Sequence, residues 1–366
     1  MRFPFPRDGE NGPHQRLKDL FECLEIYLVE YIPETDQGKY FNGVHARSCD
    51  KGETFRAEEL DVPIPYIRAG VNDLAKDYLE RLGRPLLEDE TLDAWKKFTK
   101  QYDKHSTRSY LQFAYVPSQE LQMEFEIPPT GLPCSVVDWM ETFEGSTGGY
   151  DRALTEMVLD AISFGVVGPK SEWWCIRNIP GMPSEVIVKT ALVTAIEPDD
   201  VNDMMSPLRV TAGGKQYLFS HVISVVPLPS FATIDTSKLS ISPMQRNAIR
   251  RLQYEPSTKV GMRFQSNWWK EAKQIGGQSF TDLPIRTVVY QSYGDSHESN
   301  VLLASYCWTS DAERLGSLMC AKCMEATPRT GMGVVTESTD TTAVLDDLVL
   351  RDLAAVHEVD IEFLRQ

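Results

Sequence analysis

The feature that most constrains the fold is a change of hydrophobic period near the middle of the chain. Between residues 186 and 307 the apolar residues form short runs, rich in β-branched and aromatic side chains and separated by turn residues, which is typical of strands. These runs are VIVKTALVTAI, LRVTA, YLFSHVISVVPL, STKVGMRF, RTVVYQS and VLLASYCW. One helix is predicted among them, in SPMQRNAIRRL, with Ser242 as its N-cap and Pro243 as its first helical residue.

Helical periodicity dominates the first third of the chain. An apolar stripe at steps of three and four residues predicts one helix with a buried face, formed by Leu17, Leu20, Phe21, Leu24, Tyr27 and Leu28. The same period returns over 64–82 and 87–116, and a further helix is predicted from Asp151. The last predicted helices are 344–355 and 357–365. Helices and strands are therefore mixed, and the fold class expected is α/β (mixed α+β).

Composition narrows the choice of partners. The chain has 366 residues with 42% hydrophobic content, enough to bury one large core or two ordinary ones. Lys and Arg number 37 against 53 Asp and Glu, and a net charge of -16 repels polyanions, so nucleic acid is not an expected partner. No run approaches the roughly 20 apolar residues of a membrane span, and the N-terminus lacks the apolar core of a signal peptide. As written, the chain is expected to be cytoplasmic and not membrane-bound.

Self-contained catalytic and metal motifs are absent from the sequence. There is no G-x-S-x-G, H-E-x-x-H or G-x-x-x-x-G-K-[ST], and the six His show no metal-ligand spacing. Seven Cys are scattered, and the pair Cys320-x-x-Cys323 is interpreted as incidental. Gly331-x-Gly333 is interpreted as a loop, because neither a preceding strand nor a following helix is indicated. No metal site is predicted.

Lys259 is the residue whose sequence context bears most directly on function. Strand alternation in STKVGMRFQ places Lys259, Gly261 and Arg263 on one face and the apolar residues on the other. Such a polar face ordinarily meets water. Two features favour a functional site instead: Gly261 leaves room beside the backbone, and Trp268-Trp269 could wall off a dry cavity. A desolvated lysine has a lowered pKa and can hold a water or act as a base.

Several segments in order resemble the flavin amine oxidase family, in particular fungal L-amino-acid oxidases. They are SVVPLP from Ser224, SPMQRNAIRRLQYEPSTKVGMRFQSNWWKE, IGGQSFTDLPIRTVVYQS, VLLASYCWTSDAERL, the opening Met1-Arg2-Phe3-Pro4 and WWCI from Trp173. The resemblance implies FAD as cofactor and roles for five residues. Lys259 would hold a water at the flavin, Arg2 and Tyr306 would bind the substrate carboxylate, and Val193 and Trp268 would contact the cofactor.

The resemblance also implies a domain organisation. Residues 1–50 and 255–350 would form a mixed-sheet substrate domain, 51–170 a helical domain, 171–254 a partial FAD/NAD(P)-binding domain and 351–366 a C-terminal helix returning to it. Family members carry a G-x-G-x-x-G turn before the M-R-F-P segment and a flavin-contacting motif near their C-terminus, and this sequence has neither. Backbone amides at such a turn bind the pyrophosphate. We therefore expect a truncated member with impaired or no activity.

The implied reaction is oxidation of an L-amino acid by oxygen to a 2-oxo acid, ammonia and hydrogen peroxide. Two alternatives stay open: a non-catalytic fragment or interaction protein that retains the substrate-domain scaffold, and a monoamine or polyamine oxidase. The last would share Lys259 but would have no carboxylate to bind. The sequence leaves open whether the protein forms a homodimer.

Overall fold

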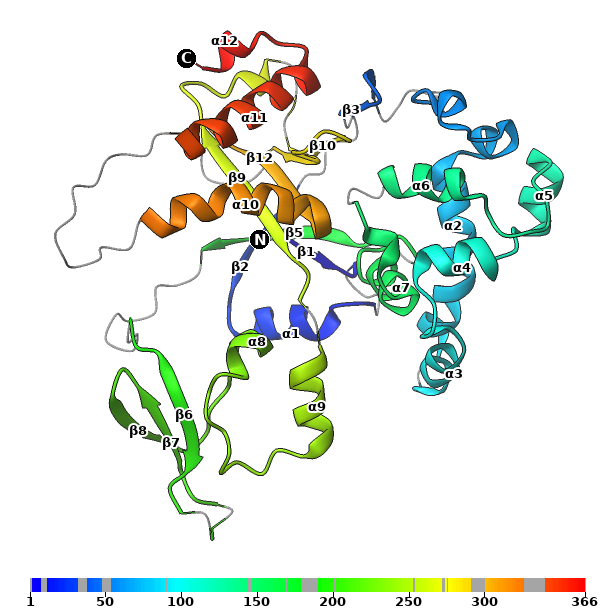
Figure 1. Ribbon diagram of the computed structural model, residues 1–366. Coiled ribbons are helices and arrows are strands. Elements are labelled where there is room, and N and C mark those ends of the chain that lie inside the picture. The colour runs from blue at the N-terminus through cyan, green and yellow to red at the C-terminus, as the bar shows by residue number, and fades with distance from the viewer. Residues whose placement is uncertain are drawn as a thin grey trace. The chain divides into compact units, whose positions relative to one another are not determined.

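The computed structural model describes most of the chain. The described residues are 2–7, 12–31, 38–47, 54–89, 91–143, 147–168, 170–178, 190–200, 202–203, 205–252, 254–271, 274, 276–290, 300–325 and 340–365. Within them, the side chains of residues 2, 177, 178, 319–325 and 340–342 are not described. Gly331-x-Gly333 and the side chains of Cys320 and Cys323 therefore lie outside the description. The chain forms two compact units, Met1–Ile179 with Pro256–Gln366, and Pro180–Glu255 (Figure 1).

A helical region occupies the middle of the first unit. Its helices are η1 (Ala57–Leu60), α2 (Ile64–Glu88), α3 (Asp93–Tyr102), α4 (Thr107–Phe113), α5 (Gln119–Phe125), α6 (Cys134–Phe143), η2 (Gly149–Asp151) and α7 (Leu154–Ser163). Figure 1 shows them gathered around α2, and their apolar faces share one core. Fully buried members include Leu74, Tyr78, Leu111 and Met140. The predicted helical periodicity is confirmed here, although α7 begins at Leu154 and Asp151 lies in the preceding 3-10 turn.

Helix α2 extends beyond its predicted end and bends at one glycine. Gly70 has φ +79, a left-handed value that favours glycine, and it divides the helix into two segments. Beyond it the helix continues through Pro85 to Glu88. Leu79 and Leu82 lie beyond Gly70 in the helix and are buried in the core. Their packing stabilises the helix segment that follows the bend.

A three-stranded antiparallel sheet joins the N-terminus to the end of the helical region. Its order is β1 (Arg2–Phe5), β5 (Glu172–Asn178) and β2 (Tyr27–Glu30). The prediction of one helix through Leu28 was wrong: α1 (Gln15–Cys23) ends early, and Tyr27 and Leu28 belong to β2. Glu25 has φ +52, which turns the chain, and pairing with β5 replaces helical hydrogen bonds. Pairing with β5, which is distant in sequence, therefore outweighs the helical spacing of Tyr27 and Leu28.

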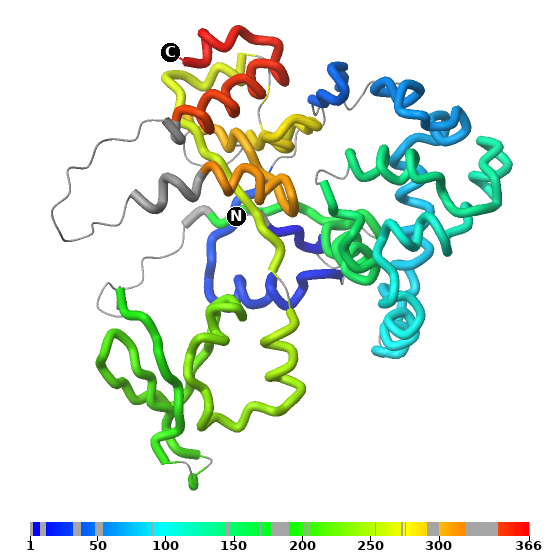
Figure 2. Tube along the Cα trace, viewed as in Figure 1, coloured from blue at the N-terminus to red at the C-terminus, as the bar shows by residue number. Residues whose placement is uncertain are grey.

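A six-stranded mixed sheet forms the other half of the first unit. Its order is β4 (Val44–Arg47), β3 (Gly38–Phe41), β10 (Gln278–Thr281), β11 (Thr287–Val289), β12 (Val301–Trp308) and β9 (Ser257–Arg263). Only the β10–β3 pair is parallel among the described ladders. Figure 2 shows that pair as segments from distant parts of the chain lying side by side. Strands β1 to β5 and β10 were not among the predicted runs, whereas β11 lies within the predicted run RTVVYQS.

Three helices and the 3-10 turn η4 (Trp268–Lys270) cover one face of this sheet. The helices are α10 (Thr309–Glu325), α11 (Asp340–His357) and α12 (Ile361–Leu364). They bury a core that includes Val260, Val288, Leu302, Val349 and Leu353. The two predicted C-terminal helices are confirmed with shifted limits, since His357 ends α11 instead of opening the last helix.

The second unit is small. It contains the antiparallel meander β6 (Val193–Pro198), β7 (Leu208–Ala212) and β8 (Lys215–Phe219), with α8 (Leu228–Phe231) and α9 (Pro243–Arg251). Gly213 and Gly214, both with positive φ, make the tight turn between β7 and β8. The predicted cap of α9 is confirmed: Ser242 accepts a hydrogen bond from the Gln245 amide, and the Gln245 side chain accepts one from the Ser242 amide.

The predicted strand YLFSHVISVVPL is shorter than expected. It ends at Phe219, and Ile223 and Val225 are each 90% exposed. No described strand pairs with residues 221–226, so their β-branched pattern is not sufficient to form a ladder. The five predicted domain ranges remain a prediction.

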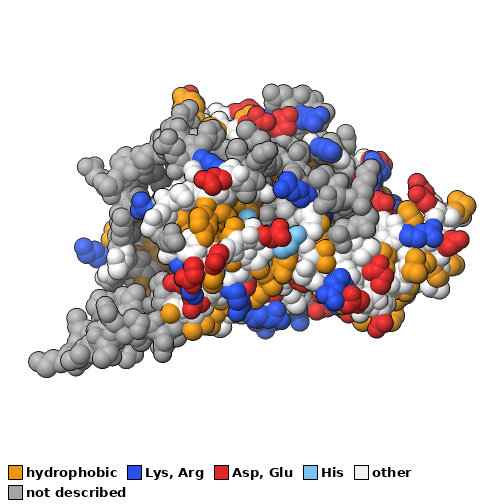
Figure 3. Space-filling model, turned by 90° about the horizontal axis from the view of Figure 1, so that it is seen from above, with side chains coloured by type: hydrophobic (Ala, Val, Ile, Leu, Met, Phe, Trp, Pro, Cys, Tyr) orange, Lys and Arg blue, Asp and Glu red, His pale blue; other side chains and the backbone are white. Residues whose placement is uncertain are grey.

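On the face seen in Figure 3, acidic and basic side chains are interspersed with apolar ones. No helix of the described residues combines the length and apolarity that crossing a membrane requires.

Candidate functional site

The candidate site lies on the exposed face of the β9–β12 ribbon. In β9, Ser257, Lys259, Gly261 and Arg263 are exposed, whereas Val260 is buried. The predicted alternation is therefore confirmed. Two hydrogen bonds fix the ribbon from its covered side: Thr258 Oγ1 donates to Ala312 O at 3.0 Å, and Ser305 Oγ donates to Ile285 O at 2.9 Å.

Strand register brings Lys259 and Tyr306 together. The two residues are direct partners in the β9–β12 ladder. The Lys259 Nζ atom lies 4.4 Å from the centroid of the Tyr306 ring, a cation–π contact. The Tyr306 ring in turn lies 4.1 Å from that of Trp308, centroid to centroid. The ribbon thus presents an ammonium group beside two aromatic rings on one face.

The expected dry cavity around Lys259 is not formed by the two tryptophans. Trp268 and Trp269 are 7% and 1% exposed and belong to the core that includes Val260, on the opposite face of β9. Trp268 contacts the rings of Phe264, Trp269 and His357. Sequence reasoning placed them wrongly because both indoles fill the space between β9 and α11–α12. Lys259 itself is exposed in the described structure.

The other predicted site residues lie elsewhere. Arg2 is the first residue of β1 and pairs with Cys175, and its side chain is outside the described part. Val193 opens β6 in the second unit, where it packs, partly buried, against the small core of Ile196. Trp268 Nε1 is buried and has no hydrogen-bond acceptor among the described residues. Of the five, only Lys259 and Tyr306 are described in contact.

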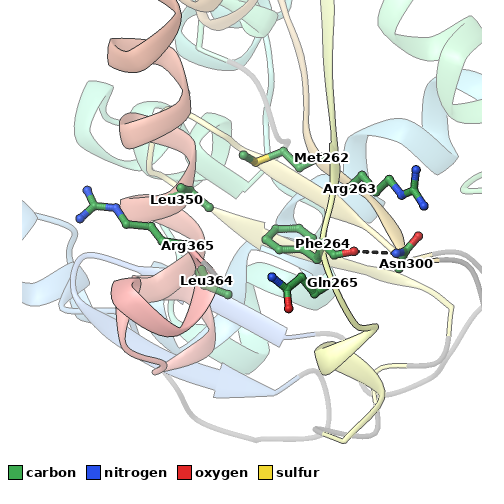
Figure 4. Close-up of a pocket in the computed structure, with 8 residues that line it drawn as sticks. All are labelled: Met262, Arg263, Phe264, Gln265, Asn300, Leu350, Leu364 and Arg365. Carbon is green, nitrogen blue, oxygen red and sulfur yellow. Dashed lines mark hydrogen bonds between the residues drawn. The ribbon is translucent and has the colours of Figure 1, made fainter.

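An open hollow of about 550 Å³ lies near the end of β9. Figure 4 shows Phe264, Leu350 and Leu364 between β9 and the C-terminal helices, with the Asn300 amide bonded to Phe264 O. Arg263 and Arg365 complete part of its rim. Arg365 is paired with Asp347 and Glu362. None of the five predicted site residues lines this hollow.

Sequence reasoning missed a buried polar chain. Ser279 Oγ lies 2.8 Å from Tyr290 Oη, which lies 3.0 Å from His357 Nε2. Burial, assisted by the charge of His45, lowers the pKa of His357 to about 4. Ser279 lies in β10, Tyr290 directly follows β11, and His357 ends α11, so no motif spacing links the three residues. Among the described residues, no cluster of His, Cys, Asp and Glu is suited to hold a metal ion.

The chain is similar in sequence to flavin-containing amine oxidoreductases and to proteins named L-amino-acid oxidases. A family model described as flavin containing amine oxidoreductase matches residues 191–320. L-amino-acid oxidase 4 of Hebeloma cylindrosporum is 38% identical over 401 aligned residues, which cover all of this chain and 61% of that protein. The cytotoxic L-amino-acid oxidase of Amanita phalloides is 41% identical over 112 residues, covering 28% of this chain and 75% of that protein.

Solved structures share the fold. Cyclohexylamine oxidase from Brevibacterium oxydans superimposes with a TM-score of 0.57 at 13% identity, over 97% of this chain and 68% of that one. Wild-type putrescine oxidase bound to putrescine gives a TM-score of 0.57 at 14% identity, over 94% and 69%. The mixed α/β architecture is thus that of amine oxidases. The match to the Hebeloma cylindrosporum oxidase extends along this whole chain, and the match to the Amanita phalloides oxidase covers 75% of that protein. The chain therefore belongs to the flavin-containing amine oxidase family.

Proposed function

We propose that the chain is part of an FAD-dependent L-amino-acid oxidase, with its substrate site on the exposed face of the β9–β12 ribbon. The observation that carries this proposal is the pairing of Lys259 with Tyr306 on that face, in a chain 38% identical along its whole length to an L-amino-acid oxidase. The chain spans 61% of that relative, so the activity proposed is that of the whole protein.

The ribbon has the chemistry that a flavin ring requires. A planar ring with carbonyl and nitrogen acceptors needs donors and a flat surface, and the face offers the Lys259 ammonium, the Tyr306 phenol and open space over Gly261. Val193, partly buried at the start of β6, is proposed to meet the adenine. When bound, the flavin would accept a hydride and deliver two electrons to oxygen, which becomes hydrogen peroxide.

The chain's own residues would bind and orient the amino acid. A guanidinium meets both oxygens of a carboxylate, so Arg2 is proposed to hold the substrate carboxylate, with the Tyr306 hydroxyl as a second donor. Lys259 would hold a water by donating to its oxygen. The substrate loses a hydride from Cα and a proton from nitrogen to form an imine. Water then adds to the imine carbon, and ammonia leaves to give the 2-oxo acid.

The first experiment tests Lys259. The purified full chain is mixed with FAD, and the flavin spectrum and peroxide release from L-amino acids are recorded for the unsubstituted protein, Lys259→Met and the control Lys39→Met. Lys39 lies in β3 of the same sheet, away from the ribbon face. We expect Lys259→Met to lower kcat by at least about tenfold, since positioned proton-transfer groups contribute about 10²–10⁴-fold. Equal rates for both variants would contradict the role of Lys259.

The same assay separates the rival functions. An unsubstituted chain that retains no FAD and releases no peroxide would favour a scaffold fragment as the role of this part of the protein, whereas peroxide release by it would exclude that role. Oxidation of isopentylamine as fast as L-leucine, with Arg2→Met leaving both rates unchanged, would instead indicate an amine oxidase without carboxylate recognition. An L-amino-acid oxidase should lose activity with L-leucine selectively when Arg2 is replaced.

A further inference from the structure

Thr309 has a backbone conformation that its residue type disfavours. Its φ is +53, in the left-handed region, where a β-branched residue is strained because Cβ crowds the following carbonyl oxygen. Such strain persists only where the surrounding structure holds the residue, and it clusters at functional sites. Thr309 is the first residue of α10 and directly follows Trp308, the last residue of the β9–β12 ladder. The strained residue therefore stands at the end of the ribbon that carries the candidate site.

Hydrogen bonds fix Thr309 from two sides. Its amide donates to Pro256 O at 3.0 Å, directly before the start of β9. Its hydroxyl has one proton to donate and two acceptors within reach, Thr147 O at 2.7 Å and Trp308 O at 2.8 Å. Thr147 belongs to the turn that precedes η2 in the helical region. Thr309 thus joins the end of the ribbon to the helical region, and both lie in the first unit.

The turn that contains Thr147 is itself held against the start of α10. The Thr147 amide donates to Asp311 Oδ2 at 2.8 Å, and Asp311 is 3% exposed and paired with Arg286. Gly148 lies so close to Ser310 that an added Cβ would be 3.4 Å from the serine Oγ. The turn therefore presents its carbonyl oxygen from a fixed position.

The aromatic pair of the candidate site lies next to this anchor. The Trp308 ring is 4.1 Å from the Tyr306 ring, centroid to centroid, and Lys259 Nζ is 4.4 Å from the Tyr306 centroid. Trp308 pairs with Ser257 at the end of the described ladder, so strand pairing does not restrain the chain beyond it. The amide and hydroxyl of Thr309 supply the next restraint on the Trp308 backbone.

We propose that Thr309 is a positioning residue for the site on the ribbon face. Its hydroxyl bridge to Thr147 holds the Trp308–Tyr306 pair in the orientation in which the Tyr306 phenol reaches the substrate. The effect on substrate binding rests on the proposed function, whereas the placement of the two rings does not. Thr309 acts through these rings and touches neither substrate nor cofactor. Its loss should raise KM more than it lowers kcat, because the phenol binds the carboxylate while Lys259 serves the chemical step.

The test compares Thr309→Val with Thr309→Ser and with the control Thr99→Val. Valine keeps the β-branched shape without the hydroxyl, whereas serine keeps the hydroxyl. Thr99 Oγ1 lies 3.0 Å from Trp95 O and 3.2 Å from Lys96 O in α3, so its replacement removes a comparable hydroxyl away from the ribbon. With FAD and L-leucine, Thr309→Val should raise KM by about three- to tenfold, the equivalent of one hydrogen bond, and change kcat by less than about twofold. Thr309→Ser and Thr99→Val should keep the KM of the unsubstituted protein.

Two further backgrounds separate positioning from a general loss of structure. In a Tyr306→Phe protein, Thr309→Val should raise KM no further, because the phenol that it positions is already absent. Near-UV circular dichroism gives a readout that needs neither cofactor nor activity. Thr309→Val should change the aromatic signal of the otherwise unsubstituted protein, and the change should be absent in a Trp308→Phe background.

Each failure has a distinct signature. In an active protein, an unchanged KM or an unchanged near-UV spectrum in Thr309→Val would overturn the inference and leave the proposed function standing. An equal rise of KM in the Tyr306→Phe background, or a Thr309→Ser protein as impaired as Thr309→Val, would overturn it as well. If the unsubstituted chain releases no peroxide, the failure belongs to the function of this chain, and the near-UV spectra alone decide whether Thr309 places the rings.

Discussion

At the scale of single residues, burial lowers the pKa of His357. Lys259 lies on the exposed face of a strand, whereas His357 ends α11 against Trp268 and donates to or accepts from Tyr290 Oη at 3.0 Å. His45 and Tyr290 are the titratable groups that face it. Burial disfavours the charged imidazolium, and the pKa falls to about 4.

This pKa predicts an acid-sensitive stability. Between pH 6.5 and about 4 the unfolded imidazole binds a proton that the folded one does not, so unfolding is favoured as pH falls. We expect the free energy of unfolding to drop by about 2 kcal/mol between pH 7 and pH 5 from this residue. Urea unfolding of the unsubstituted protein and His357→Gln at both pH values measures it. An equal pH dependence in the two proteins would show that His357 is not responsible.

At the scale of elements, α9 illustrates a structure that local sequence sets. Its capping box satisfies two backbone amides at the helix start, and its first residue, Pro243, needs no hydrogen-bond acceptor. Replacing a capping serine by alanine costs about 1 kcal/mol. Ser242→Ala should therefore raise the hydrogen-exchange rate of the α9 amides by about fivefold, while Ser240→Ala, at an exposed position before the cap, should leave it unchanged. Equal exchange in both variants would mean that the box does not stabilise the helix.

At the scale of the whole molecule, a buried ion pair connects the helical region to the six-stranded sheet within the first unit. Arg286 Nε lies 3.3 Å from Asp311 Oδ2, and both side chains are 4% exposed. Arg286 donates to Thr142 O, and Asp311 accepts from the Thr147 amide at 2.8 Å. Burial lowers the pKa of Arg286, opposed by the charge of Asp311.

Removing one partner of this pair should destabilise the first unit. A single buried charge left without its counter-ion costs about 3–5 kcal/mol. Asp311→Asn should lower the urea midpoint accordingly, and the double variant Asp311→Leu with Arg286→Met should recover part of the loss, because it removes both charges. Replacement of the exposed pair Arg56–Glu59 should leave the urea midpoint nearly unchanged, because water and salt screen exposed charges. A midpoint for Asp311→Asn equal to that of the unsubstituted protein would rule out a stabilising role.

The sequence by itself determined the elements whose signals are local. The helical region, the cap at Ser242 and the alternation of β9 follow from periods of 3.6 and 2 residues and from capping chemistry, which act within a few residues. The resemblance that led to the family was also readable, because its motifs are contiguous runs.

Only the tertiary structure decided which segments meet. The pairing of β3 with β10 and of β2 with β5 joins stretches more than a hundred residues apart, so Tyr27 and Leu28 became a strand despite their helical spacing. Likewise, the core between β9 and the C-terminal helices took up Trp268 and left Lys259 with Tyr306 on the open face. Strand pairing and burial depend on partners that are distant in sequence, and a local pattern carries no information about them.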